Sequence, residues 1–115
     1  MVRRRADMTV EKRYCVVLTT CGDKDEAEGL ARLLVEKRLA ACVQISGVTS
    51  VYEWEKEIQK DDELLLVIKA RADLYGEIEG AISDNHSYEV PEIIKIPIEK
   101  GLDAYLGWID EVSRK

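Results

Sequence analysis

The sequence predicts an α+β domain with the ferredoxin-like order β-α-β-β-α-β, an antiparallel sheet and one extra helix at the C-terminal end. Short runs of apolar and β-branched residues alternate with two segments whose apolar residues recur at helical spacing. The connection between the second and third strands is short, which requires antiparallel pairing. The chain has 115 residues, an ordinary length for one domain. Both helices of this fold cover one face of the sheet, so the other face needs cover from further copies of the chain.

The first strand is predicted at Tyr14–Thr20, where a continuous apolar and β-branched run is typical of a strand buried on both faces. Residues 21–23 are predicted to form a turn, and residues 24–38 a helix. Asp23 and Glu26 have the spacing of a capping box, which marks a helix start. The apolar residues of this helix recur every three or four positions and therefore form one face that packs on the sheet.

The second strand segment, Leu39–Trp54, is rich in Val, Ile, Thr and Tyr, which suit a strand. From Ala41 to Trp54 an extended chain would span about 45 Å, which is long for one strand of a small domain. We therefore expect a bend at Ser46–Gly47, because Gly within a strand often marks one. Beyond the bend, Val48–Glu57 forms an arm that extends past the domain. The unpaired backbone groups of such an arm favour pairing with another chain, which again indicates an oligomer.

The next reversal of the chain is expected within the polar segment Glu57–Asp62. The apolar run Leu64–Ile68 predicts a buried strand that pairs antiparallel with the arm. Asp73 is expected to begin the second helix. The inner face of this helix is predicted to carry Leu74, Ile78, Ala81 and Ile82.

The last strand is predicted at Ile93–Ile98. Pro97 has no N–H donor, so it belongs on an edge strand or at a strand end. Asp103 is expected to cap a third helix. One side of that helix is predicted to carry Tyr105, Trp108, Ile109 and Val112.

The composition of the chain limits the partners that it can bind and the cellular compartment in which we expect it. The formal net charge of −6 opposes nucleic-acid binding, which needs a basic surface. No apolar run reaches the roughly 18 to 20 residues of a membrane span. The three cysteines are an odd number, which argues against a disulfide framework. We therefore expect a reducing, cytoplasmic location.

Residues 1–12 are expected to be a flexible leader that precedes a single domain at residues 13–115. Arg3, Arg4 and Arg5 are followed by no apolar stretch, so this leader is not expected to be a secretory signal. Two interpretations stay open. The leader is either without a function of its own or a contact site for an acidic partner.

Motifs for nucleotide binding and catalysis are absent from the sequence. Neither G-x-x-x-x-G-K-[ST] nor G-x-G-x-x-G occurs, and there is no serine-hydrolase elbow. The chain has one histidine, which excludes a metal site built from several histidines of one protomer. A catalytic Cys–His pair is the remaining enzymatic alternative. We therefore expect a binding protein and not an enzyme.

His86 is the main candidate for ion binding. It stands in His-Ser-Tyr-Glu-Val-Pro-Glu at the predicted end of the second helix. There it either caps helix carbonyls or binds a soft metal ion or an anion. Cys21 and Cys42 are candidate thiolate partners, and a Cys–His pair prefers copper or zinc to magnesium or calcium. A cysteine taken alone is more often a small buried apolar residue than a metal ligand.

Residues at the strand ends are candidates for an interface or a cleft. Trp54 and Glu55 lie on the predicted arm, where an indole either anchors an interface or forms a pocket wall. Lys69 ends the buried strand and is interpreted as a solvated end residue. Glu92 precedes the last strand, where its carboxylate is either solvated or orients His86.

Five short sequence segments, taken together, are specific for one protein family. They are Leu39–Val43, Tyr52–Glu55, Leu66–Lys69, His86–Ile94 and Asp103–Trp108. Through them the chain resembles the CutA family of divalent-cation tolerance proteins from about Val16 to Trp108. The usual His-Pro-Tyr of the family reads His86-Ser87-Tyr88 here. A copper-binding bacterial member has a cysteine where this sequence has Thr19, two residues before Cys21.

The resemblance implies a ferredoxin-like protomer in a homotrimer whose long strands are shared between neighbours. It also implies tolerance and binding of copper(II) or another divalent cation, with His86 and Cys21 as candidate ligands. A second hypothesis follows from the similarity of this architecture to PII signalling proteins. In that hypothesis, clefts between protomers, lined by Trp54, Lys69 and Tyr88, bind a small anion, a nucleotide or a partner protein.

Overall fold

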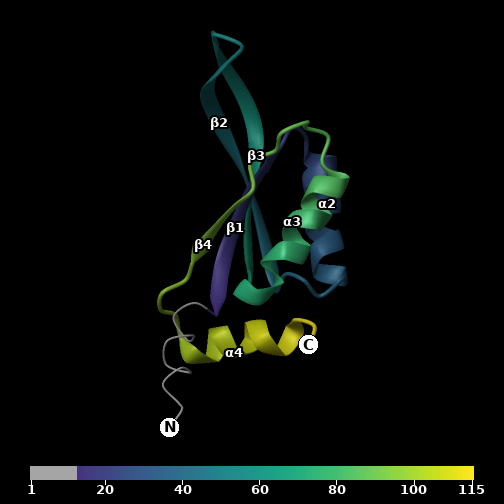
Figure 1. Ribbon diagram of the computed structural model, residues 1–115, viewed down its shortest axis with the longest axis vertical. Helices are drawn as coiled ribbons and strands as arrows, with labels where there is room; N and C mark the ends of the chain where they lie inside the picture. The colour runs from purple at the N-terminus through teal and green to yellow at the C-terminus, as the bar shows by residue number, and fades with distance from the viewer. Residues whose placement is uncertain (1–12) are drawn as a thin grey trace.

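A computed structural model describes residues 13–115 of the chain (Figure 1). The leader expected at residues 1–12 lies outside the described residues. In the described part, the predicted order β-α-β-β-α-β with an added helix is confirmed. The elements are β1 (Tyr14–Cys21), α2 (Lys24–Glu36), β2 (Cys42–Trp54), β3 (Glu57–Arg71), the 3-10 turn η1 (Ala72–Leu74), α3 (Tyr75–Asn85), β4 (Ile94–Pro97) and α4 (Asp103–Val112).

The four strands form one antiparallel sheet in the order β2-β3-β1-β4. The two central strands are β1 and β3, as their continuous apolar runs predict. Val17 of β1 lies opposite Ile68 of β3, and both side chains are fully buried. Helices α2 and α3 lie side by side on the same face of the sheet (Figure 1). The hydrophobic core therefore forms between this sheet face and the two helices.

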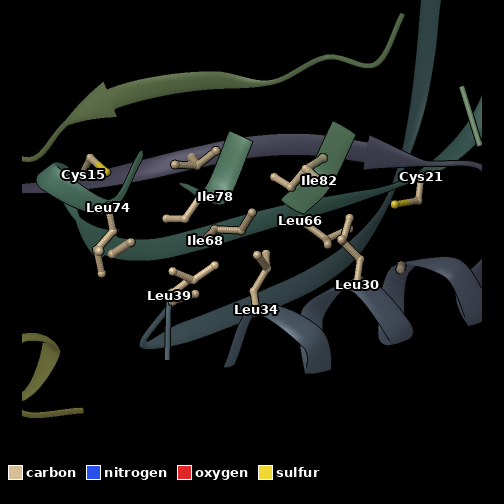
Figure 2. Packing of buried hydrophobic residues seen from close by; sticks show 14 residues of the cluster. Cys15, Cys21, Leu30, Leu34, Leu39, Leu66, Ile68, Leu74, Ile78 and Ile82 are labelled. Atoms are coloured by element: carbon tan, nitrogen blue, oxygen red, sulfur yellow. The ribbon is translucent and has the colours of Figure 1, made fainter. Parts of the chain in front are cut away.

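The core is a single layer of aliphatic side chains (Figure 2). Leu30 and Leu34 enter it from α2, and Ile78 and Ile82 enter it from α3. The predicted inner face of α3 is thus confirmed. The strands supply Leu66 and Ile68, which lie between the residues of the two helices in Figure 2, and also the two cysteines near the ends of β1.

Helix α2 begins as predicted but ends earlier. Asp23 is its N-cap and accepts a hydrogen bond from the backbone N–H of Glu26 at 2.8 Å. The predicted helix end at residue 38 is wrong, because the helix stops at Glu36 and Arg38 adopts a left-handed backbone with φ of 60°. A left-handed residue ends the helical hydrogen-bond pattern. This turn sends the chain back along the sheet into β2.

The predicted bend at Ser46–Gly47 is wrong. The register of β2 with β3 runs without interruption from Cys42 opposite Lys69 to Trp54 opposite Glu57. A long strand persists here because its partner is equally long, so the arm is a two-stranded ribbon of one chain. The ribbon extends beyond the helices (Figure 1), and the longest dimension of the described protomer is 56 Å.

The predicted reversal within Glu57–Asp62 is also wrong. The turn consists of Glu55 and Lys56, whose φ angles of 51° and 68° are those of a two-residue hairpin turn. Such a turn usually carries Asn-Gly or Asp-Gly, so its sequence signal is missing here. The polar residues 57–62 belong to β3 because this part of the strand lies on the exposed arm and needs no apolar face.

The last two helices begin slightly away from their predicted positions. The 3-10 turn η1 precedes α3, which begins at Tyr75 and not at Asp73. The cap predicted at Asp103 is wrong, because Leu102 is the N-cap residue of α4 and makes no side-chain capping bond. A side chain already inside the first turn does not occupy the capping position.

The face of α4 that packs on the domain is narrower than predicted. Ile109 is fully buried against Tyr14 and Ala41, and Val112 packs at the edge of this cluster. Tyr105 and Trp108 instead remain exposed over more than a third of their surface. The strand β4 pairs only with β1 and ends at Pro97, which confirms the edge position that proline requires.

Thr19 is a polar residue inside the core. It is fully buried in β1, and its hydroxyl has no hydrogen-bond partner among the described residues. An unpaired buried polar group is costly, whereas valine has the same shape without the hydroxyl. We therefore expect Thr19→Val to raise the free energy of unfolding by about 1 to 2 kcal/mol. Urea denaturation measures this change.

Thr20→Val is the matched control for this substitution. Thr20 is the next residue of the strand and is almost as buried, but its side chain is on the opposite sheet face. We expect no comparable gain from Thr20→Val. A loss of stability in Thr19→Val would show that its hydroxyl is hydrogen-bonded in solution.

No helix in residues 13–115 is both long enough and apolar enough to cross a membrane.

Candidate metal centre

Cys21 and His86 come together at one end of the core. Cys21 is the last residue of β1, and His86 directly follows α3 as its C-cap. The thiol Sγ lies 3.9 Å from the imidazole Nε2, and both side chains are fully buried. The fold therefore brings together the two residues that the sequence predicts as ligands.

Both nitrogens of the His86 ring make hydrogen bonds to backbone groups. Nε2 lies 2.7 Å from the carbonyl oxygen of Thr20, so it carries the proton and donates it. Nδ1 accepts a hydrogen bond from the N–H of Tyr88 at 3.1 Å. These two bonds define a neutral imidazole with its proton on Nε2. His86 thus fastens the loop after α3 to the end of β1.

Glu26 provides a third potential metal ligand, which was not predicted from the sequence. Its carboxylate lies 3.6 Å from His86 Nδ1 and accepts two hydrogen bonds from Ser87, from the N–H at 2.7 Å and from the hydroxyl at 3.0 Å. The capping-box spacing placed Glu26 in the first turn of α2, directly after the strand that ends at Cys21. That proximity along the chain was the signal available for finding it.

The three residues form a compact set of donors. Cys21 Sγ, a carboxylate oxygen of Glu26 and a ring nitrogen of His86 all lie within 4.8 Å of one another. Cys42, the other candidate thiolate, does not join them, because it lies opposite Lys69 on β3 whereas Cys21 lies opposite Leu64. We call Cys21, Glu26 and His86 the donor cluster.

The surroundings of Cys21 hold its thiol in the protonated form. Burial, together with the nearby carboxylates of Glu26, Asp23 and Glu63, raises the pKa of this thiol to about 11. The thiol is therefore neutral near neutral pH. The same negative charges would attract a cation, and a cation that binds the sulfur would displace the proton.

A groove of about 630 Å³ lies beside the donor cluster, between the arm and the loop 87–92. It brings together three of the predicted cleft residues, Trp54, Tyr88 and Glu92. Glu55 is in the hairpin turn and does not line the groove. Lys69 is also elsewhere in the protomer, where its ammonium donates an exposed hydrogen bond to the side-chain oxygen of Gln44 at 2.7 Å.

The groove is acidic and aromatic. Among the described residues its lining includes no lysine or arginine, and it is formed by Thr20, Ser50, Val51, Tyr52, Trp54, Glu63, Tyr88, Glu89, Val90 and Glu92. Three carboxylates without a basic partner disfavour an anionic ligand and favour a cationic one.

Comparison with known proteins identifies the family. Residues 15–112 match the family described as CutA1 divalent ion tolerance protein. The chain belongs to the CutA1 family. A chloroplastic CutA protein of Arabidopsis thaliana is 43% identical over 100 residues, which are 86% of this chain and 55% of the plant protein. The divalent-cation tolerance protein CutA of Thermus thermophilus is 42% identical over 97 residues, covering 84% of this chain and 94% of the relative.

The solved structures support the same assignment. CutA1 from the psychrotrophic bacterium Shewanella sp. SIB1 superposes with a TM-score of 0.88 at 40% identity, covering 91% of this chain and 99% of that one. This chain therefore spans nearly the whole of the bacterial relatives but about half the length of the plant relative. The α+β fold and the family of the chain are both shown by these matches.

The donor cluster of this CutA1 chain suits a borderline or soft divalent ion. Thiolate and imidazole ligands favour copper and zinc, and the carboxylate of Glu26 adds negative charge. The separation of 3.9 Å between Sγ and Nε2 is close to the roughly 3.6 Å between two such ligands of one tetrahedral ion. Nε2 can act as a ligand only after the ring changes tautomer, with its proton on Nδ1, the nitrogen that lies 3.6 Å from the Glu26 carboxylate. The residues thus fit an ion that replaces the thiol proton of Cys21 and selects this tautomer of His86.

Proposed function

We propose that the protein binds copper(II) or a related divalent cation at the donor cluster, as a binding protein and not as an enzyme. The observation that carries the proposal is the convergence of Cys21, Glu26 and His86 within 4.8 Å. Membership of a divalent ion tolerance family supports it. Three free thiols also favour a reducing compartment, so we propose a cytoplasmic location.

The residues of the cluster have distinct roles in this proposal. The sulfur of Cys21 and Nε2 of His86 provide the ligand atoms that select copper or zinc. Glu26 offsets the charge of the ion and holds Ser87, which keeps His86 in place. The carbonyl oxygen of Thr20, already 2.7 Å from Nε2, is a further oxygen donor. Because binding releases the thiol proton of Cys21, affinity should fall as the pH falls.

The expected result of removing a ligand is a loss of affinity. We expect Cys21→Ser and His86→Gln each to weaken cation binding by about tenfold or more, because each removes a ligand atom from the site. Copper(II) titration followed by calorimetry measures the affinity. Cobalt(II) gives a second readout, because a cobalt–thiolate bond produces a charge-transfer absorption band that requires the sulfur.

Cys15→Ser is the matched control for the cysteine variant. Cys15 is also fully buried on the same face of β1, but it lies at the other end of the strand. We expect Cys15→Ser to keep both the affinity and the cobalt band. Equal affinity in the wild type and in His86→Gln would remove His86 from the site.

We also propose that the protein works as a homotrimer whose arms extend over neighbouring protomers. Exposed apolar side chains of the protomer support this proposal. Val51 and Ile58 on the arm are 65% and 73% exposed, and Ile94 and Ile96 of β4 lie on the sheet face opposite α2 and α3. Burial of such surface in an assembly is favourable.

A signalling role of the PII type remains the second candidate function. The observation that favours it is the groove between the arm and the loop 87–92, whose volume is that of a small-ligand site. Its carboxylates make a basic segment of a partner protein a better ligand than an anion or a nucleotide. A rise in melting temperature with a cationic ligand, and none with nucleotides, would support this form of the hypothesis.

A further inference from the structure

Two of the three side chains of the donor cluster are closed to solvent, and only that of Glu26 is partly exposed, over 14% of its surface. The side chains of Cys21 and His86 are both fully buried, although an ion that binds them needs an entry path. The acidic groove adjoins the cluster, since Thr20 contributes both to its lining and to the carbonyl that holds His86. A side chain that separates the groove from the cluster would control entry to Cys21 and His86.

Tyr88 occupies that position. Its ring lies 4.8 Å from the His86 ring, measured between centroids, and it also lines the groove. Its hydroxyl lies over Gly22, directly after Cys21, since a Cβ atom at position 22 would be 3.3 Å from the phenolic oxygen. One phenol ring therefore covers both the imidazole and the backbone beside the thiol.

The closed position of Tyr88 is held by a single side-chain bond. The hydroxyl donates to the carboxylate of Glu63 at 2.6 Å. The backbone next to Tyr88 is fixed by other bonds, because its N–H is bonded to His86 and Ser87 is bonded to Glu26. A rotation of the Tyr88 side chain would therefore open the cluster without moving the loop, and the groove provides room for the ring.

We propose that the Tyr88 side chain is a gate between the acidic groove and the donor cluster, and that Glu63 is its latch. The gate serves the cation binding proposed above: the groove carboxylates concentrate cations outside it, and rotation of the phenol admits them. The gate controls how fast Cys21 and His86 are reached. It contributes no ligand atom, so it should leave the equilibrium affinity almost unchanged.

Alkylation of Cys21 by iodoacetamide tests the gate without any metal. In a Cys15→Ala, Cys42→Ser background, Cys21 is the only cysteine left in the chain. We expect Tyr88→Phe to react about tenfold faster, because it loses a hydrogen bond to a charged carboxylate but keeps the ring. Tyr88→Ala should react faster still. Mass spectrometry gives the alkylation rates. Repeating the comparison of the variants at alkaline pH separates a change in access to Cys21 from a change in the acidity of its thiol.

Tyr52→Phe is the matched control. Tyr52 lines the same groove and also donates its hydroxyl to a carboxylate, that of Asp61, but it does not cover His86 or Gly22. Its variant should react at the parent rate. Equal rates in the parent, Tyr88→Phe and Tyr88→Ala would overturn the gate, and so would an equal acceleration by Tyr52→Phe.

Zinc(II) kinetics separate this inference from the proposed function. If the cluster binds the ion, Tyr88→Phe should raise the association and dissociation rates together at nearly constant affinity. If zinc(II) and copper(II) do not bind while alkylation still depends on Tyr88, the proposed function fails and the gate stands. If the ions bind with affinities and rates that are insensitive to Tyr88, the gate fails and the site stands.

Discussion

Leu34→Ala is expected to lower the free energy of unfolding by about 3 kcal/mol, with a range of roughly 2 to 5 kcal/mol for a fully buried leucine. Leu34 lies at the centre of the core, between α2 and the sheet, and none of its surface is exposed (Figure 2). Truncation to alanine removes its apolar contacts and leaves a cavity that the rigid sheet cannot close. Urea denaturation at a fixed protein concentration measures the loss, since assembly would make stability depend on concentration.

Val35→Ala is the control from the same helix turn. Val35 is the next residue of α2, and 43% of its surface is exposed. Alanine has the higher helix propensity, so the stability should stay the same or rise slightly. Similar losses for the two variants would show that α2 does not pack on the sheet through the face described above.

The apolar patterns in the sequence were sufficient to predict the layers of the fold. Tyr14–Thr20 and Leu64–Ile68 read as buried strands and form its centre. The three/four spacing around Leu34 and Ile78 identified the faces on which α2 and α3 pack. These signals are reliable because burial constrains every residue of a core element. The same constraint is absent on the arm, where polar and apolar residues are exposed alike.

The errors about the arm follow from that absence. A Gly at position 47 suggested a bend, but the register with β3 passes through it unchanged. The hairpin turn at Glu55 and Lys56 was missed because neither residue type is favoured at positive φ. Backbone pairing between β2 and β3 determines both the straight course of β2 and the position of the turn. The residue pattern of one strand does not contain information about its pairing partner.

The candidate site was predicted only in part for a related reason. Cys21 and His86 were singled out because thiol and imidazole are rare and chemically specific. Glu26 was assigned a capping role, and its contact with Ser87 depends on how α2 and the loop after α3 are placed in space. Lys69 was placed in the same cleft as Trp54 from a resemblance in architecture. Within one protomer Lys69 and Trp54 are at opposite ends of the β2–β3 pair, so the predicted cleft requires residues of two protomers.

Trp54→Ala is expected to weaken the proposed trimer by at least about 2 kcal/mol per interface, which is about thirtyfold in an association constant. Trp54 is the last residue of β2 before the hairpin turn, and 53% of its surface is exposed in the protomer. A large aromatic side chain at the tip of an extended arm has few contacts with its own domain. It gains the most when a neighbouring protomer covers it. Sedimentation equilibrium over a range of concentrations measures the dissociation.

Trp108→Ala separates this effect from the general loss of an exposed indole. Trp108 is 37% exposed and stacks near Tyr105 on α4, at the end of the molecule opposite to the arm (Figure 1). Its removal should leave the association constant within a few-fold of the wild type. A stable wild-type species of 13.1 kDa at micromolar concentration would contradict the trimer itself. Unchanged dissociation of Trp54→Ala would show that the arm joins its neighbours through other residues, and that Trp54 acts only as a wall of the acidic groove.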